Sequence, residues 1–246
     1  MKLSKSSRIL LALISSTYLF SQGLMAETIE FPEEELATET VLPIFDHARG
    51  VLNRNVVTKK RFEFGAGGGL ALNEPFYNPF NFHIQGSYHF TELHGINILA
   101  MFLMPGLSSY GEQLKTSPYI TPQFDASKAP APSSIFMASY QLTTFYGKIS
   151  LTKKSVMNLA LFGVLGAGLM GMDSGTQLPA LNAGFGQKFY FGNRISLRLD
   201  FRVIAYQGPD PTSQTLRPTD PAPSESSFQD ELFFNTYLTA GMAFLF

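Results

Sequence analysis

The chain has no cysteine and no tryptophan, and only 15% of its 246 residues are charged. Without cysteine it can form neither a disulfide nor a thiolate metal site, and it cannot carry the cysteine-linked lipid of a lipoprotein. Its 18 basic and 19 acidic residues nearly balance, so the composition gives no reason to expect nucleic-acid binding, and no cofactor is indicated. Phenylalanine and glycine, by contrast, are abundant, with 23 and 21 copies.

Residues 1–26 are expected to be an export signal peptide. Lys2, Lys5 and Arg8 precede a short apolar stretch, and small or neutral residues lead to Ala26, after which cleavage is expected. The apolar stretch is too short to cross ~30 Å of hydrocarbon comfortably as a helix, which disfavours an uncleaved membrane anchor. Removing these residues takes away three basic and no acidic residues, so the formal net charge falls from −1 to −4.

The residues that lead to the C-terminus alternate in character. One face is almost wholly apolar and includes Phe246, Phe244, Met242 and Leu238, whereas the other mixes small, polar and charged residues. A period of two is a strand signal, and apolar-out with polar-in is the pattern of a transmembrane β-barrel. A chain that ends on such a strand with a terminal phenylalanine resembles bacterial outer-membrane barrels. Phe244 and Phe246 are therefore expected to form the signal that the barrel assembly machinery reads.

Eight alternating segments follow residue 60. The expected strands are 61–70, 80–90, 95–104, 135–150, 156–170, 178–191, 194–206 and a last one that ends at Phe246. Connections after the second, fourth and sixth are short, and those after the others are mostly longer, as in outer-membrane barrels. The sequence thus predicts an all-β fold, with an eight-stranded antiparallel transmembrane β-barrel over 61–246 and a short acidic periplasmic arm over 27–60.

Two other folds compete with this prediction. In a soluble β-sandwich or lipocalin-like barrel the apolar faces would point inward, but the opposite faces carry too little charge for a soluble surface. An inner-membrane helix over Val156–Met172 is apolar enough, but it contains four glycines and Asn158, and alternating segments flank it on both sides.

Seven charged residues fall on the inward faces by this alternation. They are Arg61, Glu63, Lys188, Arg198, Asp200, Arg202 and Glu231. Because the interior of an eight-stranded barrel is just wide enough for side chains, opposite charges there are expected to pair and plug it. The alternative is a charged constriction in a narrow outer-membrane channel.

His83, Ser87 and His89 share the inward face of the second strand and raise the possibility of a lipid A-modifying enzyme. A serine nucleophile needs a base within hydrogen-bond reach and an orienting acid. Residues two apart on one strand face are ~6.6–7 Å apart, and that strand offers no carboxylate. We therefore expect no enzyme activity, and a metal site from His83 and His89 is less favoured still.

The arm combines acidity with one apolar patch. Residues 27–46 hold seven acidic residues and no lysine or arginine. The patch and the acid that follows it form a candidate docking segment: Val41, Leu42, Pro43, Ile44, Phe45 and Asp46. It could pack at the periplasmic mouth of the barrel, dock a periplasmic or envelope partner, or belong to a loosely ordered tail.

Several of these stretches resemble a family of short outer-membrane β-barrel domain proteins from gliding and predatory bacteria. The resemblance rests on 39–46, 51–57, 61–63, 74–77, 88–92, 186–191 and 196–202. It implies the barrel fold and an outer-membrane location among lipid and lipopolysaccharide, but the family has no assigned chemistry. The expectation of a non-catalytic structural or interaction role in the cell envelope rests instead on the plugged interior and the missing triad spacing. Because a few members are linked to gliding complexes, a motility or envelope complex is also implied.

Overall fold

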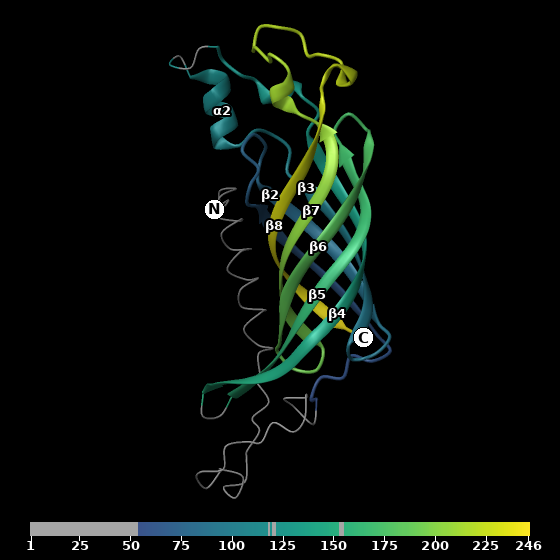
Figure 1. Cartoon of the computed structure of the whole chain (residues 1–246). Coiled ribbons are helices and arrows are strands. Elements are labelled where there is room, and N and C mark those ends of the chain that lie inside the picture. The colour runs from purple at the N-terminus through teal and green to yellow at the C-terminus, as the bar shows by residue number, and fades with distance from the viewer. Residues whose placement is uncertain (1–53, 118, 120–121, 153–154) are drawn as a thin grey trace, which may run out of the picture.

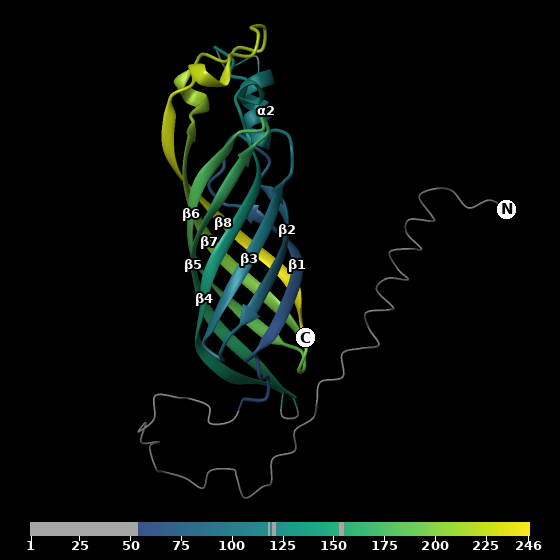
Figure 2. The same ribbon diagram turned by 90° about the vertical axis from the view of Figure 1, so that its right-hand side faces the viewer.

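The computed structural model describes residues 54–117, 119, 122–152 and 155–246. Eight strands form one closed antiparallel barrel in chain order, and the last strand pairs with the first (Figures 1 and 2). The strands are β1 (Arg61–Ala71), β2 (Phe80–His89), β3 (His94–Leu103), β4 (Pro132–Thr152), β5 (Ser155–Met172), β6 (Gln177–Tyr190), β7 (Ile195–Pro209) and β8 (Asp230–Leu245). The predicted eight-stranded antiparallel barrel is confirmed, whereas the expected signal peptide and most of the arm lie outside the described residues.

The two ends of the barrel differ. One end, the turn end, holds the connections after β2, β4 and β6, together with the C-terminus. The other, the loop end, holds the helix α2 (Ser109–Thr116) and the short helices η2 (Ala126–Lys128), η3 (Pro211–Ser213) and η4 (Glu225–Ser227). Ser108 caps α2 by accepting a hydrogen bond from the backbone N–H of Gly111 at 3.0 Å. In the part of the chain that the structure describes, no helix is both long and apolar enough to cross a membrane.

The strand ends agree with the sequence prediction to within a few residues, and β4 and β5 are the longest strands, with 21 and 18 residues. β3 pairs with β4 only as far as His94 opposite Leu142, and β6 pairs with β5 only from Tyr190 opposite Asn158. The β4–β5 hairpin therefore extends past its neighbours at the turn end, as Figure 1 shows at the bottom of the barrel. A register shift between Thr143 and Phe145 marks the place where it leaves the barrel wall.

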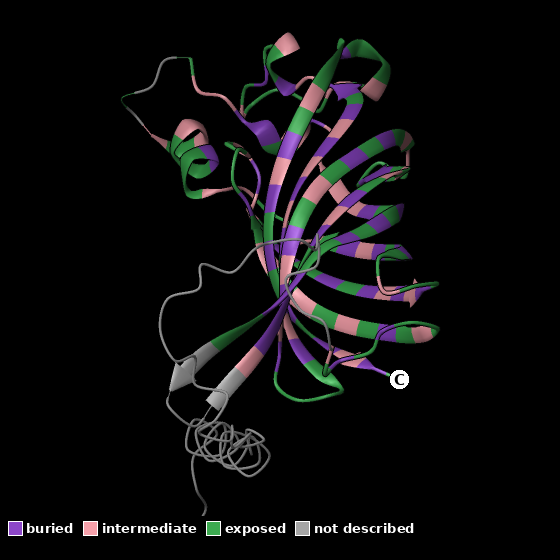
Figure 3. Cartoon of the chain, turned by 60° about the horizontal axis from the view of Figure 1, so that its bottom comes forward, coloured by how far each residue is buried: buried purple, intermediate pink, exposed green. Residues whose placement is uncertain are grey.

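Buried and exposed residues alternate along the strands (Figure 3). The outward faces are apolar and exposed, with Leu165 at 68%, Leu181 at 64% and Ile98 at 62%. The inward faces of β2 and β7 are buried and largely polar, as the alternation predicts. A soluble barrel would bury its apolar faces, so that alternative is wrong. The helix alternative over Val156–Met172 is wrong too, because this stretch is β5.

Glycines allow a close approach where β8 closes on β1. Gly67 lies opposite Gly241, and a Cβ built on Gly67 would lie 2.5 Å from the Cα of Gly241. Any larger side chain at Gly67 would push the two strands apart. By contrast, a Cβ on the outward-facing Gly68 would lie 3.2 Å from its nearest neighbour, the carbonyl oxygen of Asn81.

Candidate functional site

Five charged side chains meet inside the turn-end half of the barrel. Glu63 comes from β1, Lys188 from β6, and Arg198, Asp200 and Arg202 from β7, and each is at most 3% exposed. We call these five residues the charge network. They confirm that these predicted inward charges gather in one place, because the alternation of three strands points them at the same axis.

The network is a continuous chain of ion pairs. Lys188 Nζ donates to Glu63 Oε2 at 2.7 Å, and Arg198 Nη1 lies 3.5 Å from Glu63 Oε1. Arg198 also donates to Asp200 through Nε at 2.8 Å and Nη2 at 2.9 Å, and Arg202 Nη2 donates to the same carboxylate at 3.1 Å. Two carboxylates thus serve three cations, an arrangement that offsets much of the cost of removing the charges from water.

Neutral side chains, which were not among the predicted site residues, complete the network. Asn97 accepts a hydrogen bond from Arg202 at 2.9 Å, and Gln141 accepts one from Arg198 at 3.4 Å. The ring of Phe162 lies under the guanidinium of Arg198, 4.2 Å from Cζ to the ring centroid, and contributes a cation–π contact. The polar residues could have been found from their inward position, but nothing distinguishes Phe162 from its apolar neighbours in the sequence.

Arg61 and Glu231 were also predicted to join the network, and this part of the prediction is wrong. Arg61 is the first residue of β1 and donates instead to the backbone carbonyls of Phe246 at 2.8 Å, Leu245 at 3.0 Å and Val57 at 3.1 Å. Glu231 is exposed near the loop end of β8, opposite Gly208. Both lie at strand ends, where water or free carbonyls can satisfy a charge.

Apolar side chains make up most of the loop-end half of the interior, beside the buried polar residues Asn81, His83 and Asn235. The apolar residues come from seven of the eight strands: Ala71, Leu99, Met101, Ile135, Met137, Met170, Met172, Ala180, Ile204, Tyr206 and Tyr237. We call them the apolar layer. Met101, Ile135, Met170 and Ile204 have no exposed surface at all. The interior is therefore divided into two layers, with charge toward the turn end and hydrocarbon toward the loop end.

The three residues considered for catalysis are separated by other contacts. Ser87 Oγ accepts a hydrogen bond from Asn97 Nδ2 at 3.0 Å. His89 Nε2 lies 3.5 Å from Glu63 Oε2, at the edge of hydrogen-bond range. Among the described residues, no hydrogen bond joins Ser87 to His83 or His89, and no three His, Asp or Glu side chains are grouped to hold a metal ion.

The last residues of the arm cover the turn-end mouth. Val56 is 1% exposed and packs with Tyr146, Ala160, Tyr190 and Leu245, and its N–H donates to Tyr146 Oη at 3.2 Å. This agrees with the expectation that the arm packs at the mouth of the barrel. The candidate docking segment from Val41 to Asp46 lies outside the described residues.

Glu92, in the turn between β2 and β3, holds this cover in place. Its carboxylate accepts hydrogen bonds from the backbone N–H groups of Lys59 at 2.9 Å and Thr58 at 3.1 Å, and pairs with Arg54 at 3.2 Å. Partial burial alone would raise the pKa of Glu92, but these donors and Arg54 outweigh it and hold the pKa below its usual value of 4.5. The carboxylate therefore binds the arm in its charged form.

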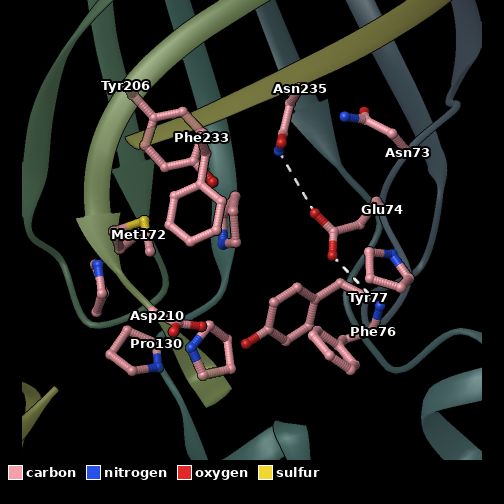
Figure 4. Close-up of a pocket in the computed structure, with 14 residues that line it drawn as sticks. Asn73, Glu74, Phe76, Tyr77, Pro130, Met172, Tyr206, Asp210, Phe233 and Asn235 are labelled. Atoms are coloured by element: carbon pink, nitrogen blue, oxygen red, sulfur yellow. Dashed lines mark hydrogen bonds between the residues drawn. The ribbon is translucent and has the colours of Figure 1, made fainter. Parts of the chain in front are cut away.

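A small pocket of about 90 Å³ opens at the loop end (Figure 4). Rings of Tyr77, Tyr206 and Phe233 line it, and Glu74 reaches into it beside Asn235, whose Nδ2 lies 3.5 Å from Glu74 Oε2. Burial raises the pKa of Glu74 above its usual value of 4.5, and donors from Phe76, Tyr77 and Asn235 offset this only in part. The pocket sits above the apolar layer and shares Met172 and Tyr206 with it.

No family model and no curated protein matches the chain. Among solved structures, it is similar to the N-terminal β-barrel domain of Pseudomonas aeruginosa OprF, with 11% identity and a TM-score of 0.38 over 76% of this chain and 98% of that one. It is also similar to a de novo designed transmembrane β-barrel, with 8% identity and a TM-score of 0.36 over 76% of this chain and 97% of that one. At these values the likeness carries no argument about function, and the fold assignment rests on the strand pairing.

Proposed function

We propose that this protein is an outer-membrane β-barrel that acts as a non-catalytic structural or interaction component of the cell envelope. The observation that carries the proposal is the filled interior. The charge network occupies the turn-end half, the apolar layer occupies the loop-end half, and Val56 covers the turn-end mouth. An interior of this size holds side chains or a small ligand but no wide aqueous channel. The two ends of the barrel are therefore the surfaces through which it would bind a partner.

The outward apolar faces support the membrane part of the proposal. A closed barrel satisfies its backbone hydrogen bonds internally and is one of the few structures that can span hydrocarbon. The expected signal peptide and the terminal Phe246 favour the outer membrane in particular, with lipid, lipopolysaccharide and the assembly machinery as partners. The resemblance to barrel proteins of gliding and predatory bacteria favours a motility or envelope complex as the setting.

Two competing functions fit the interior less well. A narrow channel would need a water path past Arg198 and then past the fully buried Met101 and Met170. A lipid-modifying enzyme would need Ser87 paired with a base, whereas its Oγ is engaged by Asn97.

The test combines conductance with partner capture. Protein purified from the outer-membrane fraction, and folded as judged by heat-modifiable migration, should give no steady unitary conductance in planar bilayers. Crosslinking in intact envelopes should recover the same partner proteins in repeated experiments. Steady conductance at full stability would overturn the closed-barrel proposal, and the absence of the protein from the outer-membrane fraction would overturn the location.

A further inference from the structure

The β4–β5 hairpin leaves an open strand edge at the turn end. Beyond the hydrogen bond from Thr143 N–H to the carbonyl of Leu93, residues 144–152 of β4 pair only with β5 within the described part of the chain. In an antiparallel ladder every second residue turns its N–H and C=O away from its partner strand. Such an edge is a template for another strand, and folded proteins usually cover or block theirs.

The arm leaves the barrel on the side of this open edge. The guanidinium of Arg54 lies 4.9 Å from the ring centroid of Tyr146, which belongs to the extended part of β4. Arg54 also pairs with Glu92, in the turn beside which β4 loses its partner β3. Arg54, to which the rest of the arm is joined, therefore contacts both the edge strand β4 and the neighbouring turn.

Chain length allows the docking segment to reach the edge. Residues 47–53, between the segment and Arg54, span up to about 24 Å when extended. The edge from 144 to 152 is about 30 Å long at the rise of a strand. Val41–Asp46 can therefore lie along much of it without disturbing the contacts of Arg54 and Val56.

The arm and the edge of β4 also match in charge and in apolar character. The surface beside this edge is basic, with Lys148 on β4 and Lys59 and Lys60 in the last residues of the arm, all exposed. Residues 27–46 carry seven acidic residues and no basic one. On the same part of β4, Phe145 is 47% and Ile149 is 40% exposed, which suits an apolar strand such as 41–45.

We propose that Val41–Asp46 docks on the open edge of β4 as an added strand, with the acidic residues of the arm against Lys148. Pro43 has no N–H to donate, so it is tolerated only where it faces away from β4, and there it makes the new edge a poor template for a further strand. This inference concerns the protein's own chain and does not rest on the proposed envelope role.

Hydrogen exchange of the amides of 144–149, followed by mass spectrometry on detergent-folded protein, tests this. The full chain is compared with a variant that lacks residues 30–50, which keeps both the expected cleavage site and Arg54. Edge amides should exchange at least about tenfold slower in the full chain, and the amides of 237–242 in β8, paired on both sides, should not change. Equal edge exchange in both proteins would overturn the proposal.

Point variants of the full chain separate charge from simple truncation. Lys148→Glu should remove most of the protection, whereas the matched Arg194→Glu, an exposed charge reversal in the turn between β6 and β7, should leave it intact. Ile44→Asp should act like the deletion and serves in its place if the deleted protein does not fold. If the amides of 144–149 stay protected in these variants and their protection increases with protein concentration, a second copy of the chain covers the edge, and the proposal is overturned.

Discussion

Arg198 donates two hydrogen bonds to the carboxylate of Asp200, one to each oxygen, although the two residues are only two positions apart on the same strand. The same carboxylate also accepts from Arg202. Asp200 is thus the one negative charge between two buried guanidinium groups, and the stability of the turn-end half depends on it.

Replacing Asp200 with lysine should therefore destabilise the barrel strongly. The change removes the partner of two buried cations and adds a third, and breaking a buried ion pair costs roughly 3–5 kcal/mol. We expect a lower midpoint of thermal unfolding in detergent with unchanged membrane localisation. The control is Asp220→Asn on the exposed loop between β7 and β8, which should have no effect. A variant that conducts ions at wild-type stability would argue for a channel.

Deletion of Phe246 should reduce assembly in the outer membrane. Its N–H donates to the carbonyl of Phe62 at 2.8 Å, and its ring, 63% exposed, lies 4.7 Å from that of Phe244, extending the outward apolar row. The heat-modifiable fraction in isolated outer membranes should fall, whereas Phe246→Tyr should keep it, because the aromatic ring remains. Normal folded yield from the deletion would show that the terminal residue is not read.

Gly67→Ala should hinder closure of the barrel. The new methyl group would meet the backbone of Gly241 across the seam between β1 and β8, and overpacking of this kind costs about 1–3 kcal/mol. Gly68→Ala is the matched control, because it faces outward with more space. Urea unfolding in lipid vesicles should separate the two variants, and equal midpoints would mean that the seam can widen freely.

The arm should detach from the turn end in acid. The pKa of Glu92 is lowered in the folded protein, so its stabilising contribution is present above about 4.5 and is lost as the pH falls through the lowered value. In ¹⁵N-labelled protein, the amide signals of Thr58 and Lys59 should shift together below that pH. Glu92→Gln should show the detached shifts already at neutral pH, and Glu112→Gln on α2 should not.

Glu74 should show the opposite dependence. Its pKa is raised by burial, so its contribution is present in acid and is lost as the pH rises above 4.5 through the raised value. Glu74→Gln should therefore be more stable than the wild type at pH ~8 and no more stable at pH ~4. Thermal unfolding at the two pH values decides this, and a constant difference between them would mean that Glu74 stays charged throughout.

The alternation of side chains predicts the strands and their inward faces, because a closed barrel gives every residue only two directions. It correctly places Glu63, Lys188 and Asp200 together. It fails for Arg61 and Glu231, since alternation says nothing of how near a residue lies to a mouth. The apolar layer was not foreseen either: residues such as Met101 and Ile135 point inward in strands that are apolar on both faces, so only the register between strands reveals them.

If the barrel inserts into a membrane as proposed, its two-layered interior also implies an order in which the inward side chains lose their water. Glu63, Lys188 and Arg198 all lie within a few residues of the turn end of their strands. A barrel that enters the bilayer with its loop end leading takes the methionine-rich half in first, while the charged half stays wet. The ions are then dehydrated last, when β1, β6 and β7 are already side by side in the closing barrel. Membrane entry therefore need not expose a lone charge to hydrocarbon at any step.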